Sequence, residues 1–335
     1  MMTSMNVTQL NTPGQYECSF SAMNTWIEVK FQAVENEVEN LIHLAKNWFE
    51  TVEQCFSRFR ANSELCYLNR SAGKTCLVSD PMLEVLQLTE LYRTKTDHIF
   101  EPFILQALIE AGYCESFELL DIDRVDSSPF RDRHTAQAYP LIALDVKMKS
   151  VLLPAGLHLD LGGIVKSWSV KRFASYLRNK RFVEKGLINA GGDLLAWNSS
   201  EERTHQWSIR IEDPWNPKKE LGVINRNNLA VATSSTLGRQ WTNSQGAQHH
   251  LIDPRTMRPS TSDTVQCTVI GQDPVECEIW SKTICILGRE EGTQLLLARA
   301  PGYEALVFTE DYQSHFYGKS ELWKTVDTDE IHLTV

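Results

Sequence analysis

The chain has 335 residues, of which 42% are hydrophobic and nine are tryptophan. This is enough apolar material for a sizeable core, and it excludes disorder of the whole chain. The formal net charge of -10 disfavours nonspecific nucleic-acid binding, because a phosphate backbone attracts a basic face.

The N-terminal stretch carries no recognisable export signal. Residues 1–14 are polar, without a basic start or an apolar block of about 7 to 15 residues. No apolar run approaches the roughly 20 residues that cross a bilayer, so we expect a cytoplasmic protein without a membrane segment. No linker rich in Pro, Gly or Ser divides the chain. We therefore expect a polar N-terminal segment over residues 1–18 and one compact domain over residues 19–335.

The eight cysteines are scattered without C-x-x-C spacing. In a chain of this length without an export signal, such cysteines are expected to be reduced thiols that pack in the interior. A zinc site is not expected.

The first half of the chain predicts helices separated by loops. Residues 35–56 carry apolar residues at helical spacing, which indicates a long core helix. A second helix follows Ser79-Asp-Pro81, where proline suits the first turn, and runs to about Lys95. The other expectations are a hairpin or edge strand over residues 19–32, loops over 56–69 and 96–102, a short helix over 103–111, an exposed excursion over 121–140 and a pair of strands over 141–153.

Two double-glycine corners organise the middle of the chain. Residues 158–173 read as a short apolar run, a double glycine and an amphipathic helix, and residues 186–193 as a strand ending in a second double glycine with an acid. Gly162 and Gly163 leave the first backbone N–H groups of the helix open to a ligand, which suits phosphate. Lys166 lies in the same first turn, where the helix dipole does not favour a cation, so an anion is expected nearby.

Asp160, just before the first corner, is placed to accept hydrogen bonds or to hold a metal. The alternative interpretation is a tight turn with Asp160 as its capping acid, because short motifs of this kind are weak signals. The glycine spacing is not Gly-x-Gly-x-x-Gly, so a Rossmann dinucleotide site is unsupported.

Beyond Asp193 the sequence turns mostly to short strands separated by Pro, Asn and Gly. Such segregation of helices and strands indicates an α+β fold. The expected elements are strands over 207–212, 229–233, 249–253 and 264–271, a buried helix over 277–287, and closing strands over 304–308 and 315–317.

Several short motifs stand in a fixed order along the chain. In the second half they are Asp160-Leu-Gly-Gly-Ile-Val-Lys166, Asn189-Ala-Gly-Gly-Asp193, Ala232-Thr-Ser234 and His250-Leu-Ile-Asp-Pro-Arg-Thr256. In the first half they are Met23-Asn-Thr25, Ser63-Glu-Leu65 with Leu68-Asn69, and Thr96-Asp-His-Ile-Phe-Glu-Pro102. In this order and at these intervals they resemble the FAD:protein FMN transferase family, also called the ApbE family, over about residues 19 to 310. Each motif alone is weak, but together they make a chance match improbable.

The resemblance implies an α+β fold, a single compact ApbE-like domain with mixed and antiparallel β-sheets and packed helices. Members of this family hold FAD and, with Mg²⁺, move its FMN half onto a threonine hydroxyl of a target flavoprotein, releasing AMP. Phosphoryl transfer of this kind needs charge neutralisation, a base for the hydroxyl and in-line positioning. The helix start and Lys166 would serve the phosphates, while Asp160 and His250 would lie near the reacting groups.

The resemblance also assigns site residues. Phe59 stands where the family tends to have tyrosine, which keeps a stacking face but loses a hydroxyl. Glu101 stands where an aspartate is usual, and the Gly163 carbonyl would help to hold the metal. The residues expected to contact FAD are Met23, Phe59, Ile99, Phe100, Glu101, Asp160, Lys166 and His250.

His250 is the candidate base. An unperturbed histidine pKa of about 6.5 suits a general base at neutral pH. The alternative is an ordinary hydrogen-bonded residue of a strand, next to His249. Asp253, three residues further on, is expected to cap the turn into Pro254.

The largest departure from the family lies in residues 276–288, where an Asp and a Thr four positions later usually bind Mg²⁺. Counted from Gly288, the equivalents are Glu278, a plausible oxygen ligand, and Lys282, whose ammonium has no acceptor and cannot ligate. Three interpretations stay open. Glu278 and Lys282 form a helix pair with no ligand role, Lys282 replaces the metal charge at the pyrophosphate, or the register shifts and Thr283 is the family threonine.

Two functions follow from these alternatives. The first is an active FAD:protein FMN transferase that uses FAD and a divalent cation. The second is a non-catalytic FAD-binding relative that binds or delivers flavin without transfer. The residue at position 282 divides them.

Overall fold

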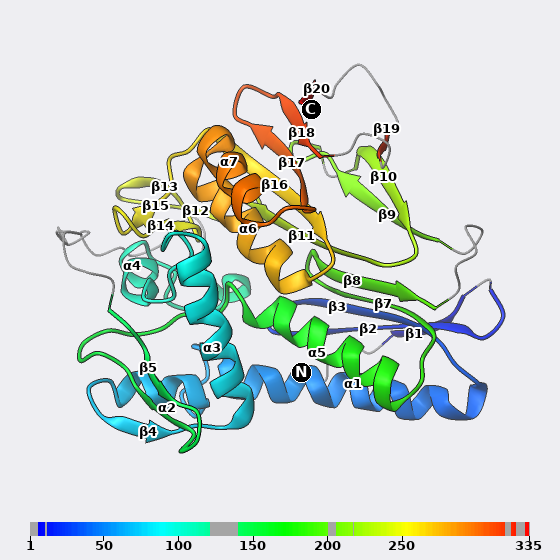
Figure 1. Ribbon diagram of the computed structural model, residues 1–335, viewed down its shortest axis with the longest axis horizontal. Coiled ribbons are helices and arrows are strands. Elements are labelled where there is room, and N and C mark those ends of the chain that lie inside the picture. Colours follow the sequence, from blue (N-terminus) through cyan, green and yellow to red (C-terminus); the bar gives the residue numbers. More distant parts are fainter. Residues whose placement is uncertain are drawn as a thin grey trace.

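The fold is built on a ten-stranded sheet that runs through the whole molecule (Figure 1). The computed structural model describes residues 6–10, 12–120, 140–199, 206–216, 218–318, 323–325 and 332–334. Neighbouring strands of the sheet are antiparallel, apart from the last pair, which is parallel. In spatial order the strands are β1 (Asn6–Gln9), β2 (Gln15–Ala22), β3 (Thr25–Gln32), β7 (Lys185–Ala190), β8 (Asp193–Asn198), β11 (Leu229–Ser235), β16 (Thr264–Gly271), β17 (Glu304–Thr309), β18 (Ser314–Tyr317) and β20 (His332–Thr334).

Helices pack against this sheet and against one another. They are α1 (Glu35–Phe56), α2 (Glu64–Arg70), α3 (Asp80–Lys95), α4 (Leu105–Glu110), α5 (Val165–Lys180), α6 (Pro274–Leu287) and α7 (Arg289–Arg299), with a 3₁₀ turn η1 (Phe117–Leu119). Helix α5 packs on β7 and β8, α6 packs on β11 and β16, and the two helices contact each other. Figure 1 shows α1 and α5 running along the same side of the sheet. The start of α5 and the middle of α6 are therefore brought together.

Smaller sheets surround the main one. They are a three-stranded sheet of β4 (Thr75–Leu77), β6 (Ser150–Leu152) and β5 (Ala143–Asp145), another of β19 (Trp323–Thr325), β10 (Glu220–Arg226) and β9 (Trp207–Glu212), and the pairs β12 (Gln240–Asn243) with β13 (Gly246–His249) and β14 (Ile252–Asp253) with β15 (Arg258–Pro259). The two short pairs lie beside α4 in Figure 1. This arrangement of helices and mostly antiparallel sheets confirms the expected α+β class.

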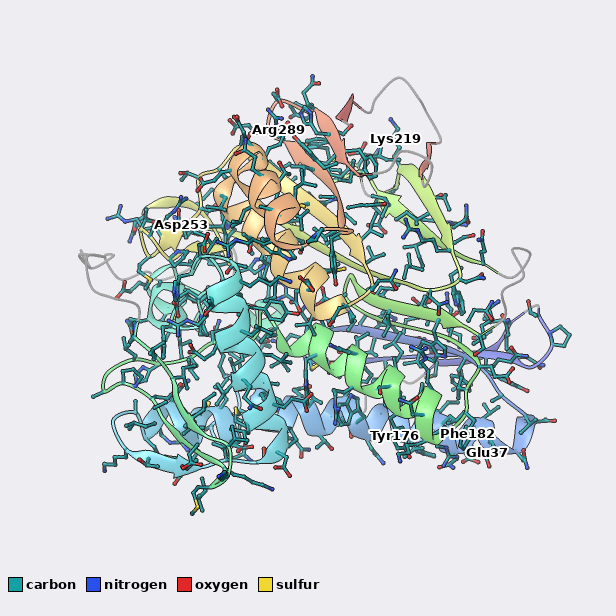
Figure 2. The ribbon with its side chains drawn as sticks, viewed as in Figure 1. Glu37, Tyr176, Phe182, Lys219, Asp253 and Arg289 are labelled. Atoms are coloured by element: carbon teal, nitrogen blue, oxygen red, sulfur yellow. The ribbon has the colours of Figure 1, made fainter. Side chains whose placement is uncertain are left out.

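The core forms because apolar residues recur at the period of each element. In α1, Leu41, Ala45 and Phe49 lie on one face and pack in one buried cluster with Phe20 of β2 and Ile27 of β3. Full burial of a side chain of this size contributes about 1.5–3 kcal/mol. Side chains fill the space between the helices and the sheet throughout (Figure 2).

The far ends of α1 and α5 are also joined. Arg181, immediately after α5, forms an ion pair with Glu37 in the first turn of α1. Figure 2 shows Glu37 at the same end of the molecule as Tyr176 and Phe182. The pair fixes the two helices at the end opposite the double-glycine corner.

The long elements confirm the expectations from the sequence. The helices over 35–56 and 80–95 have the expected bounds, and residues 19–32 belong to the β2–β3 hairpin. The eight cysteines are free thiols, and those that are buried are Cys18, Cys76, Cys267, Cys277 and Cys285. No helix within the described residues is long and apolar enough to span a bilayer.

Two local expectations were wrong, and one helix was not expected. Residues 64–70 form α2 rather than a loop, because the Ser63 hydroxyl accepts a hydrogen bond from the Cys66 N–H at 3.0 Å and starts a helix. The expected strand over 249–253 is interrupted after His249, and α7 follows Gly288 without having been expected.

Two further expectations are not tested. Of the expected excursion over 121–140, only Pro140 lies within the described residues. The division into residues 1–18 and 19–335 stays a prediction, although β1 lies inside the polar segment and pairs with β2, which begins at Gln15.

Candidate functional site

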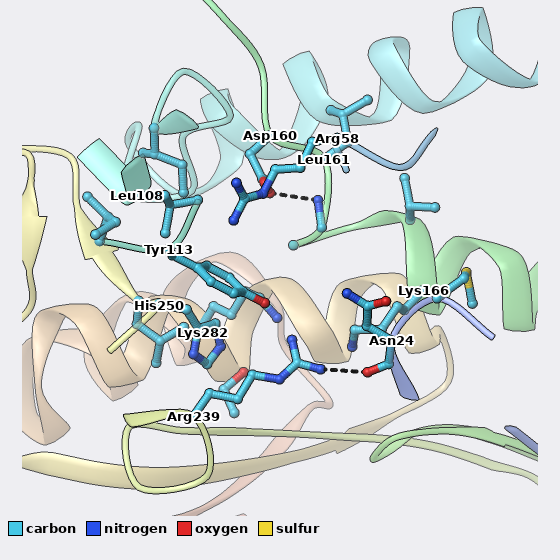
Figure 3. A pocket seen from close by; sticks show the side chains of 18 of the residues that line it. Asn24, Arg58, Leu108, Tyr113, Asp160, Leu161, Lys166, Arg239, His250 and Lys282 are labelled. Carbon is cyan, nitrogen blue, oxygen red and sulfur yellow. Dashed lines mark hydrogen bonds and ion pairs between the residues drawn. The ribbon is translucent and has the colours of Figure 1, made fainter. Parts of the chain in front are cut away.

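A pocket of about 480 Å³ opens where the two double-glycine corners, α6 and the loop between β13 and β14 meet (Figure 3). This volume is typical of small-molecule sites, which span about 300–1,000 Å³. The lining includes every residue expected to contact FAD, together with Gly163 and Lys282. Glu278 does not line the pocket, because its side chain is fully buried beneath Lys166 and Lys282. The sequence therefore identified residues that the fold gathers at one place, and their contacts with a ligand remain proposals.

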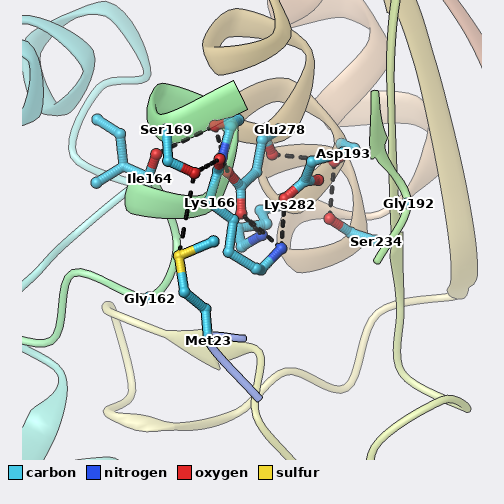
Figure 4. Close-up of polar contacts among 12 residues, drawn as sticks. Met23, Gly162, Ile164, Lys166, Ser169, Gly192, Asp193, Ser234, Glu278 and Lys282 are labelled. Carbon is cyan, nitrogen blue, oxygen red and sulfur yellow. Dashed lines mark hydrogen bonds and ion pairs between the residues drawn. The ribbon is translucent and has the colours of Figure 1, made fainter. Parts of the chain in front are cut away.

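One side of the pocket is backed by a cluster of alternating charges, which we call the charged floor: Lys166, Asp193, Glu278 and Lys282 (Figure 4). Of these, Lys166 and Lys282 line the pocket. The Lys166 ammonium pairs with the Asp193 carboxylate and lies 3.4 Å from Glu278 Oε1. The Lys282 ammonium lies 2.9 Å from the same Glu278 oxygen. Two cations thus face two carboxylates, and the cluster is balanced without a bound ion.

The second Glu278 oxygen is also occupied. Ser167 donates to Oε2 through its hydroxyl and through its backbone N–H, the latter at 3.3 Å. The start of α5 therefore meets a protein carboxylate, which the helix dipole stabilises. The anion expected near Lys166 is present, but Asp193 and Glu278 supply it.

The local sequence explains how these side chains meet. Glu278 and Lys282 lie one turn apart on the same face of α6. Lys166 stands in the first turn of α5, and Asp193 begins β8 directly after Gly191 and Gly192. Both glycines have positive φ, and a Cβ at Gly191 would lie 2.0 Å from the Thr25 hydroxyl, so only glycine fits this corner.

The surroundings of the two acids shift their pKa values in opposite directions. Burial, together with the charge of Glu278, raises the pKa of Asp193 to about 6 despite the opposing Lys166. Burial would also raise the pKa of Glu278, but Lys166, Lys282 and the hydrogen bonds from Lys282 and Ser167 outweigh it and lower that pKa to about 2. Glu278 is therefore the permanently ionised centre of the floor.

A second part of the pocket lining is an aromatic wall, formed by Arg58, Phe59 and Tyr113, with Trp241 packed behind Tyr113. The Arg58 guanidinium lies 4.1 Å from the Phe59 ring centroid and 4.5 Å from that of Tyr113. Tyr113 in turn packs against Trp241, with ring centroids 5.3 Å apart. Such cation–π contacts contribute about 0.5–2 kcal/mol, depending on how far the cation is desolvated.

Asp160 belongs to this wall. Its Oδ2 accepts from Arg58 Nε at 2.8 Å, and its Oδ1 accepts from the Gly162 N–H at 2.8 Å. Because α5 begins only at Val165 and the Gly162 N–H is already used, the corner is a capped turn, as the alternative interpretation held. Asp160 therefore positions Arg58, and its catalytic role stays a prediction.

The loop over residues 96–102 delivers Ile99 and Phe100 to the pocket. The Thr96 hydroxyl accepts from the Phe100 N–H at 3.0 Å. Glu101 is buried, where it pairs with the fully buried Arg93 at 2.9 Å and accepts from the Phe103 N–H at 3.1 Å. The Glu101 carboxylate is thus engaged within the protein, and it anchors the loop.

His250 lies in the break between β13 and β14 and is half-buried. Burial lowers its pKa well below 6.5, and the nearby Arg239 and Lys282 lower it further. Its Nδ1 is buried without a hydrogen-bond partner among the described residues. His250 is therefore neutral and can accept a proton, whereas Nε2 of His249 is held by the Ser260 carbonyl at 3.0 Å.

Asp253 caps the turn after Pro254 as expected. Its Oδ1 accepts from the Arg255 N–H at 2.8 Å, and its carboxylate pairs with the Arg255 guanidinium.

Several lining residues were not predicted from the sequence, and those with charged or aromatic polar side chains include Arg58, Tyr113 and Arg239. Arg239 Nη2 donates to the Asn24 carbonyl at 3.1 Å and so joins the β2–β3 turn to the loop after β11. An isolated arginine in an unpatterned loop carries no signal of its own. The stacking of Arg58 between Phe59 and Tyr113 can be recognised only in the folded structure.

Comparison with known proteins agrees with this geometry. A model of the ApbE family matches residues 23–307. The chain belongs to the ApbE family. Proteins called FAD:protein FMN transferase are similar to it in sequence: that of Klebsiella pneumoniae (strain 342) is 29% identical over 245 residues, which is 72% of this chain and 73% of that protein. That of Treponema pallidum (strain Nichols) is 24% identical over 274 residues, 77% and 74% of the two chains.

Solved structures show the same fold. An ApbE protein from Thermotoga maritima superposes with a TM-score of 0.78 at 20% identity, covering 90% of this chain and 96% of its own. The flavin transferase ApbE from Vibrio cholerae gives a TM-score of 0.75 at 20% identity, covering 92% and 98%. The ApbE-like domain expected from the sequence is therefore confirmed.

Proposed function

We propose that this chain is an FAD:protein FMN transferase, which binds FAD in the pocket and moves its FMN half to a threonine of a partner flavoprotein. The observation that carries the proposal is that Lys166, Lys282, Arg239 and His250 line one pocket together with aromatic residues. The relatives named FAD:protein FMN transferase support the same reaction. A diphosphate needs cations, a planar ring needs apolar faces, and a hydroxyl nucleophile needs a base.

The reaction exchanges one P–O bond for another. The threonine oxygen attacks the phosphorus of the FMN half, the bond to the bridging oxygen breaks, and AMP leaves with that oxygen. His250 takes the hydroxyl proton on a ring nitrogen, and the cations of the pocket stabilise the charge that grows on AMP. Binding of the anionic diphosphate offsets the field of Arg239 and Lys282, so the pKa of His250 rises and its basicity increases.

The residues of this site do not fit Mg²⁺, which the family resemblance implies. Both oxygens of Glu278 already accept hydrogen bonds from protein donors, and the ammonium of Lys282 is one of these donors. Within the described residues, no group of three or more His, Cys, Asp or Glu side chains is placed to hold a metal. The cations of the protein, rather than a metal ion, therefore act on the diphosphate.

The test is a transfer assay. Purified protein is mixed with FAD and a flavoprotein domain that bears an acceptor threonine, with the Thr→Val domain as the control. We expect a mass increase of one FMN less water on the threonine domain alone, with release of AMP. FAD binding without an adduct would instead favour the non-catalytic relative, which the unusual Lys282 makes the second candidate.

The partner and the location are proposals of the same kind. The acceptor threonine must reach the pocket next to His250, so the partner presents it on an exposed segment. The cytoplasmic location expected from the sequence is tested by fractionating cells that express the native protein, and recovery with membranes or periplasm would contradict it.

A further inference from the structure

We infer that Lys282 supplies, from within the protein, the positive charge that a divalent cation would otherwise give to a bound diphosphate, so that this chain binds FAD without metal. The inference rests on the proposed function, because it concerns the phosphates of FAD in the same pocket. It also interprets the misfit to Mg²⁺ as a property of this chain.

The position of Lys282 is the first support. Its Cε lies 3.4 Å from the place where a Cβ on Gly163 would stand, next to Phe100 Cε2 at 3.3 Å. The side chain is 16% exposed and lines the pocket, so the ammonium lies at the first double-glycine corner and reaches the pocket space. Figure 3 shows it beside His250.

The shifted register is disfavoured by the neighbouring residue. Thr283 is fully buried, its hydroxyl donates to the Ile279 carbonyl at 2.8 Å, and it does not line the pocket. A threonine at this place on α6 cannot reach a ligand. The residue that faces the pocket at this turn is Lys282.

A simple helix pair does not describe the contact either. An exposed pair at this spacing contributes about 0.2–0.5 kcal/mol and leaves both side chains in water. Here Glu278 is fully buried and is shared between Lys282 and Lys166. The pair is part of the charged floor.

The balance of charges in the floor supports this role of the Lys282 ammonium. Without Lys282, the floor would hold one cation, Lys166, against the carboxylates of Asp193 and Glu278, and this excess of negative charge would attract a cation. With Lys282 the floor is neutral, and an added Mg²⁺ would meet two ammonium groups. Lysine binds phosphate as a point charge, so a diphosphate can replace part of the contact to Glu278.

The test is calorimetric titration of FAD into the wild-type protein, once with EDTA and once with MgCl₂. We expect affinities within about twofold of each other in the two buffers. If FAD binds at least tenfold more weakly in EDTA, the inference is overturned while the proposed function stands. If FAD binds in neither buffer, both fail. This comparison needs no variant, so it holds even if a substitution prevents folding.

Two variants at position 282 sharpen the test. Lys282→Met keeps the aliphatic stem without the charge, and we expect FAD affinity in EDTA to fall at least tenfold. Lys282→Thr should lose as much in EDTA but recover several-fold with MgCl₂, because Glu278 is then free of one ammonium. Unchanged affinity of Lys282→Met in EDTA would refute the inference.

The matched control is Lys171→Met. Lys171 also stands on a helix and pairs with an acid, Asp273, but it does not line the pocket. We expect its FAD affinity to equal that of the wild type in both buffers. A similar loss in this control would mean that the effect at position 282 is general electrostatics, and the inference would fail.

Discussion

The two sides of the pocket hold their cations in different ways. In the charged floor, Lys166 and Lys282 are balanced by carboxylates that come from β8 and α6. In the aromatic wall, Arg58 has one carboxylate, Asp160, and is otherwise stacked between rings. The floor therefore depends on mutual charge balance over distant segments, whereas the wall combines one ion pair with stacking contacts. The comparison predicts that single changes are more damaging in the floor.

The largest effect is expected from Glu278→Gln. Removing this charge leaves two largely buried ammonium groups with less compensation, and breaking a buried pair typically costs about 3–5 kcal/mol. Urea denaturation of the wild type and of Glu278→Gln measures the difference in the free energy of unfolding. The control is Glu220→Gln, whose partner Arg210 is 69% exposed, and we expect a change of no more than about 1 kcal/mol there. A loss below about 1 kcal/mol for Glu278→Gln would mean that the floor is not a charge-balanced unit.

The same pair of proteins gives a pH test of stability. The pKa of Glu278 is lowered from 4.5 to about 2 in the folded protein, so its stabilising contribution is present above the unfolded value and is lost as the pH falls toward 2. Between about pH 7 and 4 the protonation of Asp193, whose pKa Glu278 helps to raise to about 6, also changes this difference. Below about pH 4, the difference in unfolding free energy between wild type and Glu278→Gln should shrink as the pH falls toward 2. A difference that grows below about pH 4 would contradict the assignment.

His250 lines the pocket near Lys282, and its replacement is expected to act on the reaction. His250→Gln keeps a polar group but removes the base, and loss of a general base costs about 10²–10⁴-fold in rate. FMN transfer to the acceptor domain should fall by at least about a hundredfold, while calorimetric FAD affinity changes by less than about fivefold. His249→Gln is the control, since that ring is held by Ser260. Equal rates for wild type and His250→Gln would exclude His250 as the base.

The pH profile of transfer is a smaller effect of the same residue. Because the pKa of His250 in the free protein lies below 6.5, the proton-accepting form persists as the pH falls to that value. We expect kcat/KM to stay flat from about pH 8 to 6.5 and to fall below it, and the fall in kcat to begin at higher pH, since bound FAD offsets Arg239 and Lys282. A fall in kcat/KM that begins above pH 6.5 and disappears in His250→Gln would contradict the lowered pKa.

The sequence predicted those parts of the molecule whose pattern is visible within a short stretch of residues. The helix over 35–56 followed from its apolar spacing, and the anion near Lys166 followed from the helix dipole. Helix α2 was missed because a few polar residues between a serine cap and Ser71 resemble a loop. A cluster such as the charged floor lies beyond local reasoning, because Glu278 is 112 residues from Lys166 in the sequence. Only the packing of α6 against α5 brings them together.

The aromatic wall was only partly visible for a similar reason. Phe59 could be assigned from the family resemblance, whereas Tyr113 and Trp241 come from different segments and meet only in the fold. Arg58 was overlooked next to Phe59 because a cation beside an aromatic residue in the sequence does not imply stacking. The resemblance thus located the pocket, and the structure supplied the partners of each charged group.

The most direct measurement compares the affinities of two ligands, one for the charged floor and one for the aromatic wall. ADP carries the diphosphate without the flavin, and riboflavin carries the flavin ring without phosphate. Each is titrated into the wild type, Lys282→Met and Phe59→Leu. We expect Lys282→Met to weaken ADP at least tenfold and riboflavin less than twofold. We expect Phe59→Leu to weaken riboflavin about two- to tenfold and to leave ADP unchanged, because loss of a ring contact costs about 0.5–1.5 kcal/mol. Equal losses for both ligands in both variants would contradict the division of the pocket into a charged floor and an aromatic wall.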